Sequence, residues 1–534
     1  MTVPRVLIAL AFLLILGVPF ALRPAVEKRA GGDDAPAIII ITPHVQQIRR
    51  EFEAAFDRWH HARFGQHARI DWRTPGGTTE IIKQLEAQYT AAVREGRFDL
   101  SDPADPRCPP GTIGVDLAFG GGSFDHTRLK TGVTVTFPTP GAGEPRPVRI
   151  PMSEPAGFSQ SQLDEWYGPN TVGSQPLYDP EQFWLGTALS SFGIVYNRDV
   201  LAKLGLPEPR RFDDLTDPRY RGWIALADPR QSGSVTTTFE AILNSYGWEK
   251  GWRILRDLCA NTRYYTNSST KPPIDISAGE AAAGLAIDFY GRSQAQSIAR
   301  PGERPEGSRV GYIDPQTALY IDADPISLMR GGPNPQLARR FVEFCLSEES
   351  QALWQFPALL TNPDAGANTL AEGRRMGPAT YELRRMPVRR IMYEKHLVHF
   401  VDKVNPFDMA REIPNHGWRS SIGVMMGCFA IDIADEQRAA WAALNRARGN
   451  PTFPPDRLAE LERLFYGWPM HEMADGTRLL FGEATFKAIE KDTARWRDPA
   501  RTPSARIAYT AFFRRSYEKV IQIEAAVRAE STRD

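Results

Sequence analysis

The sequence has few cysteines and no excess of either charge. Its 534 residues include four cysteines, too few for a scaffold built on many disulfides. No two of them form a C-x-x-C pair, so a zinc site made of thiolates is not expected. Lysine plus arginine and aspartate plus glutamate both number 64, which gives a formal net charge of zero. A neutral chain lacks the electrostatic footprint of a nucleic-acid-binding protein.

The common catalytic motifs are missing as well. The chain has no G-x-S-x-G elbow, no H-E-x-x-H motif, no P-loop and no intact dinucleotide fingerprint. We therefore expect a protein that is not an enzyme. A hydrolase or transferase remains the alternative, because carboxylates are abundant and the sequence alone does not place them. Hydrophobic residues make up 42% of the chain, which is ample material for large buried cores.

Residues 1–26 differ from the rest of the chain. Arg5 precedes an uncharged apolar run over residues 6–22, and Arg23 closes the run. This order is typical of a secretory signal or an uncleaved signal anchor, and residues 27–36 form a polar linker after it. We expect a periplasmic or extracytoplasmic protein, either released or anchored in the membrane by this segment. In an oxidising compartment the cysteines could form one or two disulfides or stay as buried thiols.

Strand and helix patterns alternate after the linker. Residues 37–41 are a continuous, mostly β-branched apolar run, typical of a strand buried on both faces. An amphipathic helix follows, and further strands are predicted over residues 68–73 and 115–119. This alternation predicts a parallel α/β layer, and a second α/β unit begins with a strand at residues 223–227. The segments 101–114 and 132–180 are rich in Pro, Gly and Asp, so we interpret both as long loops or insertions.

Three loops in these units share one chemistry. Each follows a strand, contains glycine or small hydroxyl residues and opens a helix: Gly76-Gly77-Thr78-Thr79, Gly120-Gly121-Gly122-Ser123 and Ser232-Gly233-Ser234. The first turn of a helix has unpaired N–H groups and a partial positive charge, which suits a carboxylate or a phosphate. A plain helix cap uses the same residue types. Because ligands of open α/β sheets bind at the carboxyl ends of the strands, we expect the loops to share one crevice.

Several longer motifs occur in the order found in extracellular solute-binding proteins of ABC importers. Residues 185–198, LGTALSSFGIVYNR, resemble the strand that crosses between the two lobes of those proteins. Residues 212–222, FDDLTDPRYRG, and 223–234, WIALADPRQSGS, follow at the family's spacing, and 328–335, LMRGGPNP, complete the pattern. The resemblance covers roughly residues 37–360. It is greatest to the branch that binds ferric iron or small phosphorylated and carboxylated organic anions.

The resemblance implies an α/β fold of the type II periplasmic-binding kind, with two lobes joined by a hinge. Lobe one would comprise residues 37–185 and a return segment, 315–360, and lobe two would comprise residues 190–312. The chain would cross near Ser190-Ser191 and again near Asp314-Pro315. A solute held between the lobes would stabilise the closed form, which an ABC permease in the membrane would recognise.

The resemblance also bears on the ligand. Iron-binding members of the family use adjacent tyrosines of lobe two, often with a histidine after the first strand. His44 stands at the histidine position, but Phe289 replaces the tyrosine before Tyr290. A hard ferric ion needs several oxygen donors, so the loss of one phenolate disfavours iron. We expect a small anionic solute, no metal and no cofactor. Ferric iron held by His44, Asp288 and Tyr290 is the alternative.

The predicted ligand-binding residues come from both lobes and from the first crossing. They are Thr42, His44, Gly76, Gly77, Thr78, Gly121, Gly122, Ser190, Ser191, Ser232, Gly233, Ser234, Asp288 and Tyr290. We expect a monomer that captures the solute by hinge closure and delivers it to the permease.

Residues 365–534 exceed the part that the resemblance covers, and their pattern predicts a helical C-terminal extension. Residues 383–390 could still pack on lobe one. We expect the rest to form an added helical layer on the same domain, because an amphipathic helix usually buries one face on its own domain. Docking on a partner is the alternative. An anchored sensor or scaffold with a degenerate ligand site is a third hypothesis.

Overall fold

The computed structural model describes Phe12 and residues 35–102, 105–139, 143–299, 307–360, 376–492 and 502–531. The predicted signal or anchor segment lies outside these ranges apart from Phe12. Within them, no helix combines the length and the apolar character that a membrane span requires. All four cysteines lie in the described ranges and are free thiols, which answers the question that the sequence left open.

Lobe one is built on a sheet with the strand order β2-β1-β3-β12-β7. The strand β1 (Ala37–Ile41) pairs in parallel with β2 (Arg69–Arg73) and with β3 (Leu117–Phe119). The late strand β12 (Ile321–Met329) lies antiparallel to β3 and brings the chain back into this lobe. The helices of this lobe are α2 (Gln46–Phe64), α3 (Thr78–Arg94), α4 (Ser123–Thr131), α11 (Pro335–Cys345) and α12 (Glu348–Gln355).

The long strand β7 (Leu185–Asn197) belongs to both lobes, and all of its residues are buried. It pairs with β12 in lobe one and with β10 (Ala283–Ile287) and β11 (Val310–Ile313) in lobe two. The sheet of lobe two continues from β10 to β8 (Ile224–Ala227) and β9 (Thr262–Thr266). The helices of lobe two are α6 (Arg198–Leu204), α7 (Gly233–Tyr246), α8 (Trp248–Asn261), α9 (Lys271–Ser277) and α10 (Asp288–Ser297).

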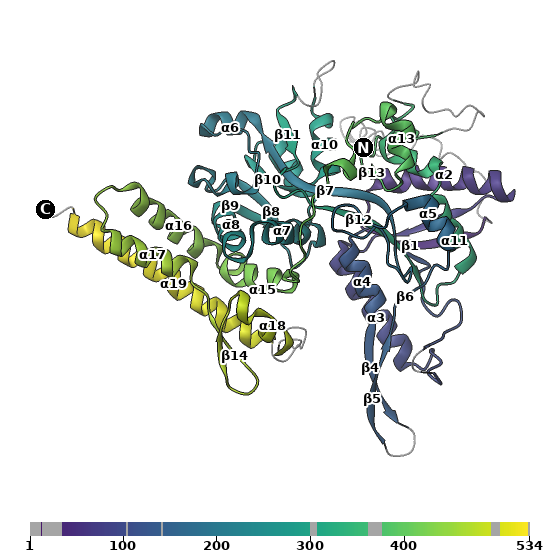
Figure 1. Ribbon diagram of the computed structural model, residues 1–534, viewed down its shortest axis with the longest axis horizontal. Helices are drawn as coiled ribbons and strands as arrows, with labels where there is room; N and C mark the ends of the chain where they lie inside the picture. The colour runs from purple at the N-terminus through teal and green to yellow at the C-terminus, as the bar shows by residue number, and fades with distance from the viewer. Residues whose placement is uncertain are drawn as a thin grey trace, which may run out of the picture.

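The two crossings of the chain are joined to each other. Ser191 in β7 donates a hydrogen bond from its hydroxyl to Asp314 Oδ1, at 2.6 Å, on the segment that leads to β12. The side chain of Tyr312 donates to the same oxygen at 2.8 Å. The predicted architecture is confirmed: two α/β lobes joined by two crossings of the chain, with a helical C-terminal extension (Figure 1).

Of the two interpretations of residues 132–180, long loops or an insertion, the first is wrong for much of the segment. It contains the hairpin β4 (Val133–Thr139) and β5 (Gly143–Ile150), the short strand β6 (Ser153–Glu154) and the helix α5 (Gln160–Tyr167). Val133, Val135 and Ile150 are buried, so the alternation of apolar residues was the local signal. The prolines and glycines of the hairpin obscured it, because these residues are rare inside strands.

The C-terminal extension contacts both lobes. Its first part adds β13 (Met386–Pro387) to β7 and places α13 (Ile391–His396) and α14 (Pro406–Met409) on lobe one. The later part packs on lobe two. It consists of α15 (Arg419–Phe429), α16 (Ala434–Gly449), α17 (Pro455–Tyr466), the hairpin β14 (Met470–Glu472) and β15 (Arg478–Leu480), α18 (Glu483–Asp492) and α19 (Thr502–Ser531).

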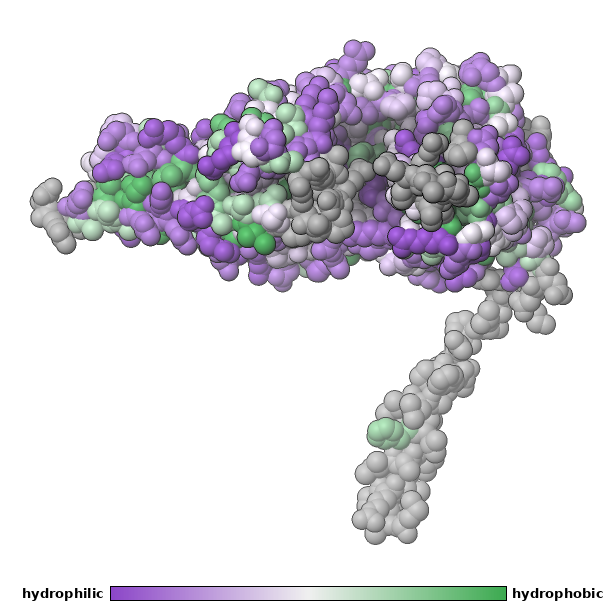
Figure 2. Space-filling view, turned by 90° about the horizontal axis from the view of Figure 1, so that it is seen from below, coloured by the Kyte–Doolittle hydropathy of each residue, from purple (hydrophilic) through white to green (hydrophobic). Residues whose placement is uncertain are grey.

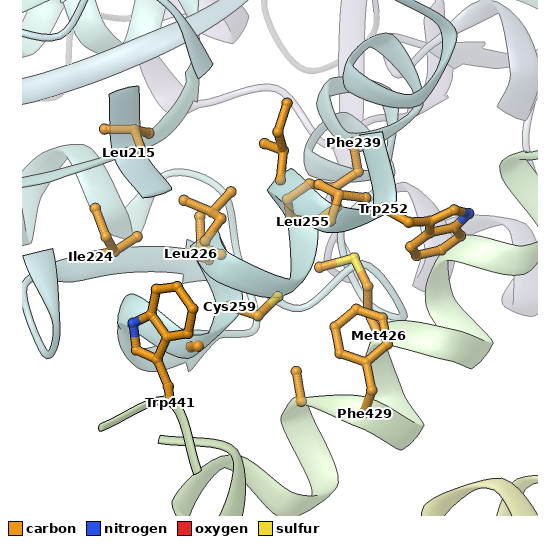
Figure 3. Close-up of a cluster of buried hydrophobic side chains, with 14 of the residues drawn as sticks. Leu215, Ile224, Leu226, Phe239, Trp252, Leu255, Cys259, Met426, Phe429 and Trp441 are labelled. Atoms are coloured by element: carbon orange, nitrogen blue, oxygen red, sulfur yellow. The ribbon is translucent and has the colours of Figure 1, made fainter. Parts of the chain in front are cut away.

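The later part of the extension shares one hydrophobic core with lobe two. Trp441, Met426 and Phe429 of the extension lie among side chains of β8, α7 and α8, including Leu226 and Trp252 (Figure 3). On its outside, apolar patches lie among hydrophilic residues (Figure 2). The core extends through both parts, so removal of the extension would expose the interior of lobe two to water.

Arg256 of α8 is buried at the centre of this contact. Its guanidinium donates hydrogen bonds to the carbonyl oxygens of Phe465, at 2.6 Å, and Gly467, at 2.9 Å. It lies 4.2 Å from the centre of the Trp468 ring. No carboxylate within the described ranges forms an ion pair with it, and burial lowers its pKa. The arginine therefore joins lobe two to the extension through carbonyl oxygens and aromatic rings.

We expect Arg256→Ala to weaken this contact strongly. The change leaves two buried carbonyl groups without their donors and opens a cavity, at a cost of about 3 kcal/mol of unfolding free energy. Arg253→Ala is the matched control, because Arg253 lies on the same helix and its side chain is 51% exposed. Thermal unfolding followed by circular dichroism measures both variants. Equal losses in the two would contradict a structural role for Arg256.

Candidate functional site

A cavity of about 400 Å³ lies between the two lobes. Lobe one lines it with the loops after β1, β2 and β3 and with the start of β12. Lobe two contributes the loops after β8 and β9 and the end of β10 with the start of α10. The carboxyl ends of parallel strands thus meet at this cavity, which is where open α/β sheets bind their ligands.

Eleven of the fourteen residues predicted from the sequence line this cavity. They are His44, Gly76, Gly77, Thr78, Gly121, Gly122, Ser190, Ser232, Gly233, Ser234 and Tyr290. Thr42, Ser191 and Asp288 are outside it. The Thr42 hydroxyl oxygen accepts a hydrogen bond from the His44 backbone N–H at 3.1 Å, so it shapes the loop after β1. Ser191 is engaged in the crossing, and Asp288 is fully buried.

The N-termini of α3 and α7 meet across the cavity. The first belongs to lobe one and the second to lobe two, and neither helix has a side-chain cap. A Cβ atom placed on Gly233 would lie 2.6 Å from Thr78 Oγ1, and one placed on Gly77 would lie 3.3 Å from the carbonyl oxygen of Gln231. The lobes are therefore closed at this point. Two helix N-termini that converge offer unpaired N–H groups and positive potential to one anion.

The third glycine loop holds carboxylates of the protein itself. The Gly121 N–H donates to Asp324 Oδ1 at 2.9 Å, and the Ser123 N–H donates to Asp322 Oδ2 at 3.2 Å. Both aspartates come from β12, about 200 residues later in the chain. These two amides are thus already occupied, and the other two loops are the ones whose helix N-termini open on the cavity.

Arg385 is a cavity residue that sequence reasoning missed. It belongs to the C-terminal extension, directly before β13, and its side chain is buried. The guanidinium donates to Asp324 Oδ2 and to Ser190 Oγ, both at 2.7 Å, and lies 4.5 Å from the centre of the Phe289 ring. A single arginine therefore ties the extension to β12, to the crossing strand and to lobe two.

His44 and Arg385 control the charge of Asp324. His44 Nε2 lies 2.8 Å from Asp324 Oδ2. Burial alone raises the pKa of Asp324, but Arg385 and His44 outweigh that effect and hold the pKa at about 2. Burial lowers the pKa of His44, and Asp324 offsets part of this shift. Asp324 is thus a permanent anion at neutral pH, and its charge is balanced inside the protein.

The residues of the iron alternative are only partly brought together. His44 and Tyr290 line the cavity, whereas Asp288 lies outside it, 3.9 Å from Arg292. Burial raises the pKa of Tyr290 to about 12, which disfavours a phenolate at neutral pH. Within the described ranges, no group of three or more His, Cys, Asp or Glu side chains is arranged to hold a metal ion.

Comparison with known proteins confirms the resemblance to solute-binding proteins. Residues 157–376 match the family model of bacterial extracellular solute-binding proteins, which are binding proteins rather than enzymes. An uncharacterized protein of Haemophilus influenzae is 30% identical over 164 residues, which are 30% of this chain and 44% of that protein. The phosphoglycerate transport regulatory protein PgtC of Salmonella typhimurium is 25% identical over 175 residues, 32% of this chain and 40% of its own length. The chain therefore spans less than half the length of these two relatives.

Two solved structures illustrate the structural neighbours. The periplasmic binding protein AfuA from Actinobacillus pleuropneumoniae, with fructose-6-phosphate bound, is 18% identical; the match covers 59% of this chain and 81% of that one, with a TM-score of 0.41. The ferric binding protein from Campylobacter jejuni is 15% identical; the match covers 75% of this chain and 98% of that one, with a TM-score of 0.45.

Proposed function

We propose that this protein is the solute-binding component of an ABC importer and captures a small phosphorylated or carboxylated organic anion outside the cytoplasm. One observation carries the proposal: the N-termini of α3 and α7, one from each lobe, meet in the same cavity. An anion between them contacts both lobes only when the lobes are closed, so it stabilises the closed form. The permease would recognise that form of a monomeric protein.

Hydroxyl groups extend the anion site on the side of lobe two. Ser234 donates a hydrogen bond to Ser269 Oγ at 2.9 Å, and Ser232 Oγ lies 3.2 Å from Ser234 Oγ. These side chains line the cavity beside the start of α7, where they can turn their protons toward an oxyanion. The nearby Lys271 is paired with Asp275 at 2.6 Å. Helix N-termini and hydroxyl groups, rather than a lysine, would therefore bind the anion.

The chemistry of the relatives agrees with this choice of ligand. PgtC carries phosphoglycerate transport in its name, and AfuA was solved with fructose-6-phosphate. Both compounds present a phosphate on a small carbon skeleton. A cavity of about 400 Å³ has room for a molecule of that size.

The proposal is tested by differential scanning fluorimetry and isothermal titration calorimetry with a panel of anions. The panel contains inorganic phosphate, 3-phosphoglycerate, fructose 6-phosphate, phosphoethanolamine, β-alanine and citrate, with ferric citrate for the iron alternative. We expect at least one organic anion to raise the melting temperature, because a ligand that binds only the folded state stabilises it. A panel without any thermal shift would contradict the proposal.

Thr78→Val should then weaken binding of the active anion by about tenfold, because it removes a hydroxyl donor at the start of α3 and keeps the size of the side chain. Thr127→Val is the control. Thr127 lies on α4, and its hydroxyl donates to the Ser123 carbonyl at 2.8 Å. We expect this control to bind like the wild type. Equal affinity of the Thr78→Val protein would place the anion elsewhere.

A further inference from the structure

The wall that lobe one contributes to the cavity is rich in carboxylates. Glu80 of α3, Asp125 of α4 and Asp322 of β12 all line it. None of the three forms an ion pair with any residue in the part of the chain that the structure describes. Arg385 on the same wall is paired with Asp324 at 2.7 Å. This wall therefore carries more carboxylates than its ion pairs balance.

Asp322 is a cavity-lining carboxylate that is itself almost fully buried. Its side chain is buried, with the residue 4% exposed, and Oδ2 accepts the Ser123 N–H. The other oxygen, Oδ1, is buried and has no hydrogen-bond partner. Burial raises the pKa of this carboxyl to about 6, so it is still largely ionised at neutral pH. A buried carboxylate oxygen without a donor is costly, and a donor on the ligand would remove that cost.

The Asp125 carboxylate lies near Gly122 and Gly233, in the same part of the cavity as Asp322. A Cβ atom on Gly122 would lie 3.1 Å from Asp322 Oδ2 and 4.0 Å from Asp125 Oδ2. Asp125 Oδ2 is also 2.8 Å from the position of a Cβ atom on Gly233, at the start of α7. The two carboxylates are thus near each other and near the proposed anion site.

A further cation, Arg419, offsets these carboxylates only in part, since its charge lowers the pKa of Asp322 but it forms no ion pair with Asp322 or Asp125 in the described structure. Arg419 of α15 donates to Glu240 Oε2 at 2.7 Å and to the Gly233 carbonyl oxygen at 3.1 Å. Its charge is balanced by Glu240 in that buried pair. Because Arg419 is shared with Glu240, a cation on the ligand would supply further counter-charge for Asp322 and Asp125.

We propose that the ligand is an amino-bearing anion, whose phosphate or carboxylate lies at the N-termini of α3 and α7 and whose ammonium group is bound by Asp322 and Asp125. This inference rests on the proposed function. An ammonium group has three donors, enough for two neighbouring carboxylates together. A metal ion is the other counter-charge, but the described residues hold no group of three or more His, Cys, Asp or Glu side chains arranged for one.

Two matched pairs of probes test the inference by titration calorimetry on the full-length protein. Phosphoethanolamine is compared with 2-hydroxyethyl phosphate, and β-alanine with 3-hydroxypropionate. We expect the amino member of the pair that binds to be about tenfold tighter, because it adds a charge-assisted bond in a desolvated site. Equal affinities within the pair, or a tighter hydroxyl member, would overturn the inference and leave the proposed function standing.

Asp322→Asn should abolish this preference and leave the affinity for the hydroxyl member unchanged or higher. Asp71→Asn is the control, because Asp71 lies on β2 with a side chain 43% exposed. Asp125→Asn, which changes the other proposed ammonium ligand, is a second variant and should reduce the preference if the first fails to fold. A gain in affinity for both members with Asp125→Asn would overturn the inference, since it would show that Asp125 merely competes with the anion. Binding of Ca²⁺ or Fe³⁺ that Asp322→Asn removes would overturn it as well. If neither pair binds although another anion of the panel does, the inference fails; if the wider panel gives no thermal shift either, the proposed function itself fails.

Discussion

Gly233→Ala should prevent closure of the lobes and lower the affinity for the anion by about tenfold or more, equivalent to about 1.4 kcal/mol. The added Cβ atom would lie 2.6 Å from Thr78 Oγ1 and 2.8 Å from Asp125 Oδ2, and both atoms belong to lobe one. Contacts this short do not persist. Unless the Thr78 and Asp125 side chains both turn away, the lobes stay apart at this point, and we expect the second outcome because Asp125 is buried. In an open form the two lobe-one atoms move away. The stability of lobe two should therefore be unchanged.

Small-angle X-ray scattering and titration calorimetry check this prediction together. We expect the wild type to compact when the anion is added and the Gly233→Ala protein to remain expanded. Gly449→Ala is the control, because a Cβ atom on Gly449, at the end of α16, meets nothing within 4 Å. Wild-type compaction and affinity in the Gly233→Ala protein would show that the lobes do not need to meet at α3 and α7.

The elements that the sequence predicted correctly are those with strong local signals. The run of isoleucines in β1 is a buried strand because its apolar character is continuous, and the α/β alternation follows from short-range periodicity. The loops before α3 and α7 were predicted as anion sites from the residues at a helix start. Whether they bind an anion remains a prediction, but the structure places both loops at one cavity.

The features that sequence reasoning missed depend on contacts between distant residues. The Gly121 amide looked free until the fold brought Asp324 to it from 203 positions away. Residues 383–390 were expected at most to pack on lobe one, and the sequence did not single out Arg385, because its partner Asp324 is 61 positions distant. Amphipathic helices in the extension were predictable, but no local pattern says that α15 and α16 cover lobe two.

Phe289 matters for two reasons, one taken from the sequence and one from the structure. From the sequence it counts as a missing phenolate and therefore as an argument against iron. In the structure its ring lies under the Arg385 guanidinium at 4.5 Å and is packed against Tyr290, with ring centres 4.1 Å apart. A phenolic hydroxyl at this place is not needed to hold the arginine, because an aromatic face alone attracts a guanidinium.

Arg385→Met should destabilise the protein by about 3–5 kcal/mol, because it leaves Asp324 as a buried carboxylate without its main cation. The change also removes the hydrogen bond that Arg385 donates to Ser190 Oγ and the guanidinium that lies over the Phe289 ring. In the wild type the folded-state pKa of Asp324, about 2, lies below the ordinary value of 3.8. Ionised Asp324 therefore contributes stability that is complete above about pH 4 and is lost as the pH falls through 2. Without Arg385 the pKa of Asp324 rises. The loss of unfolding free energy caused by Arg385→Met should therefore be smaller at acidic pH.

Urea unfolding of the single and double variants separates the causes of this loss. The Asp324→Asn background removes the carboxylate and nearly preserves its shape. If the ion pair dominates, Arg385→Met should cost much less there than in the wild type, with a coupling energy of about 2 kcal/mol or more between the two sites. A cost that stays the same in both backgrounds, at pH 8 and at pH 5 alike, would assign the role of Arg385 to its contacts with Phe289 and Ser190. The extension would then be tied to the hinge by stacking and a hydroxyl bond rather than by charge.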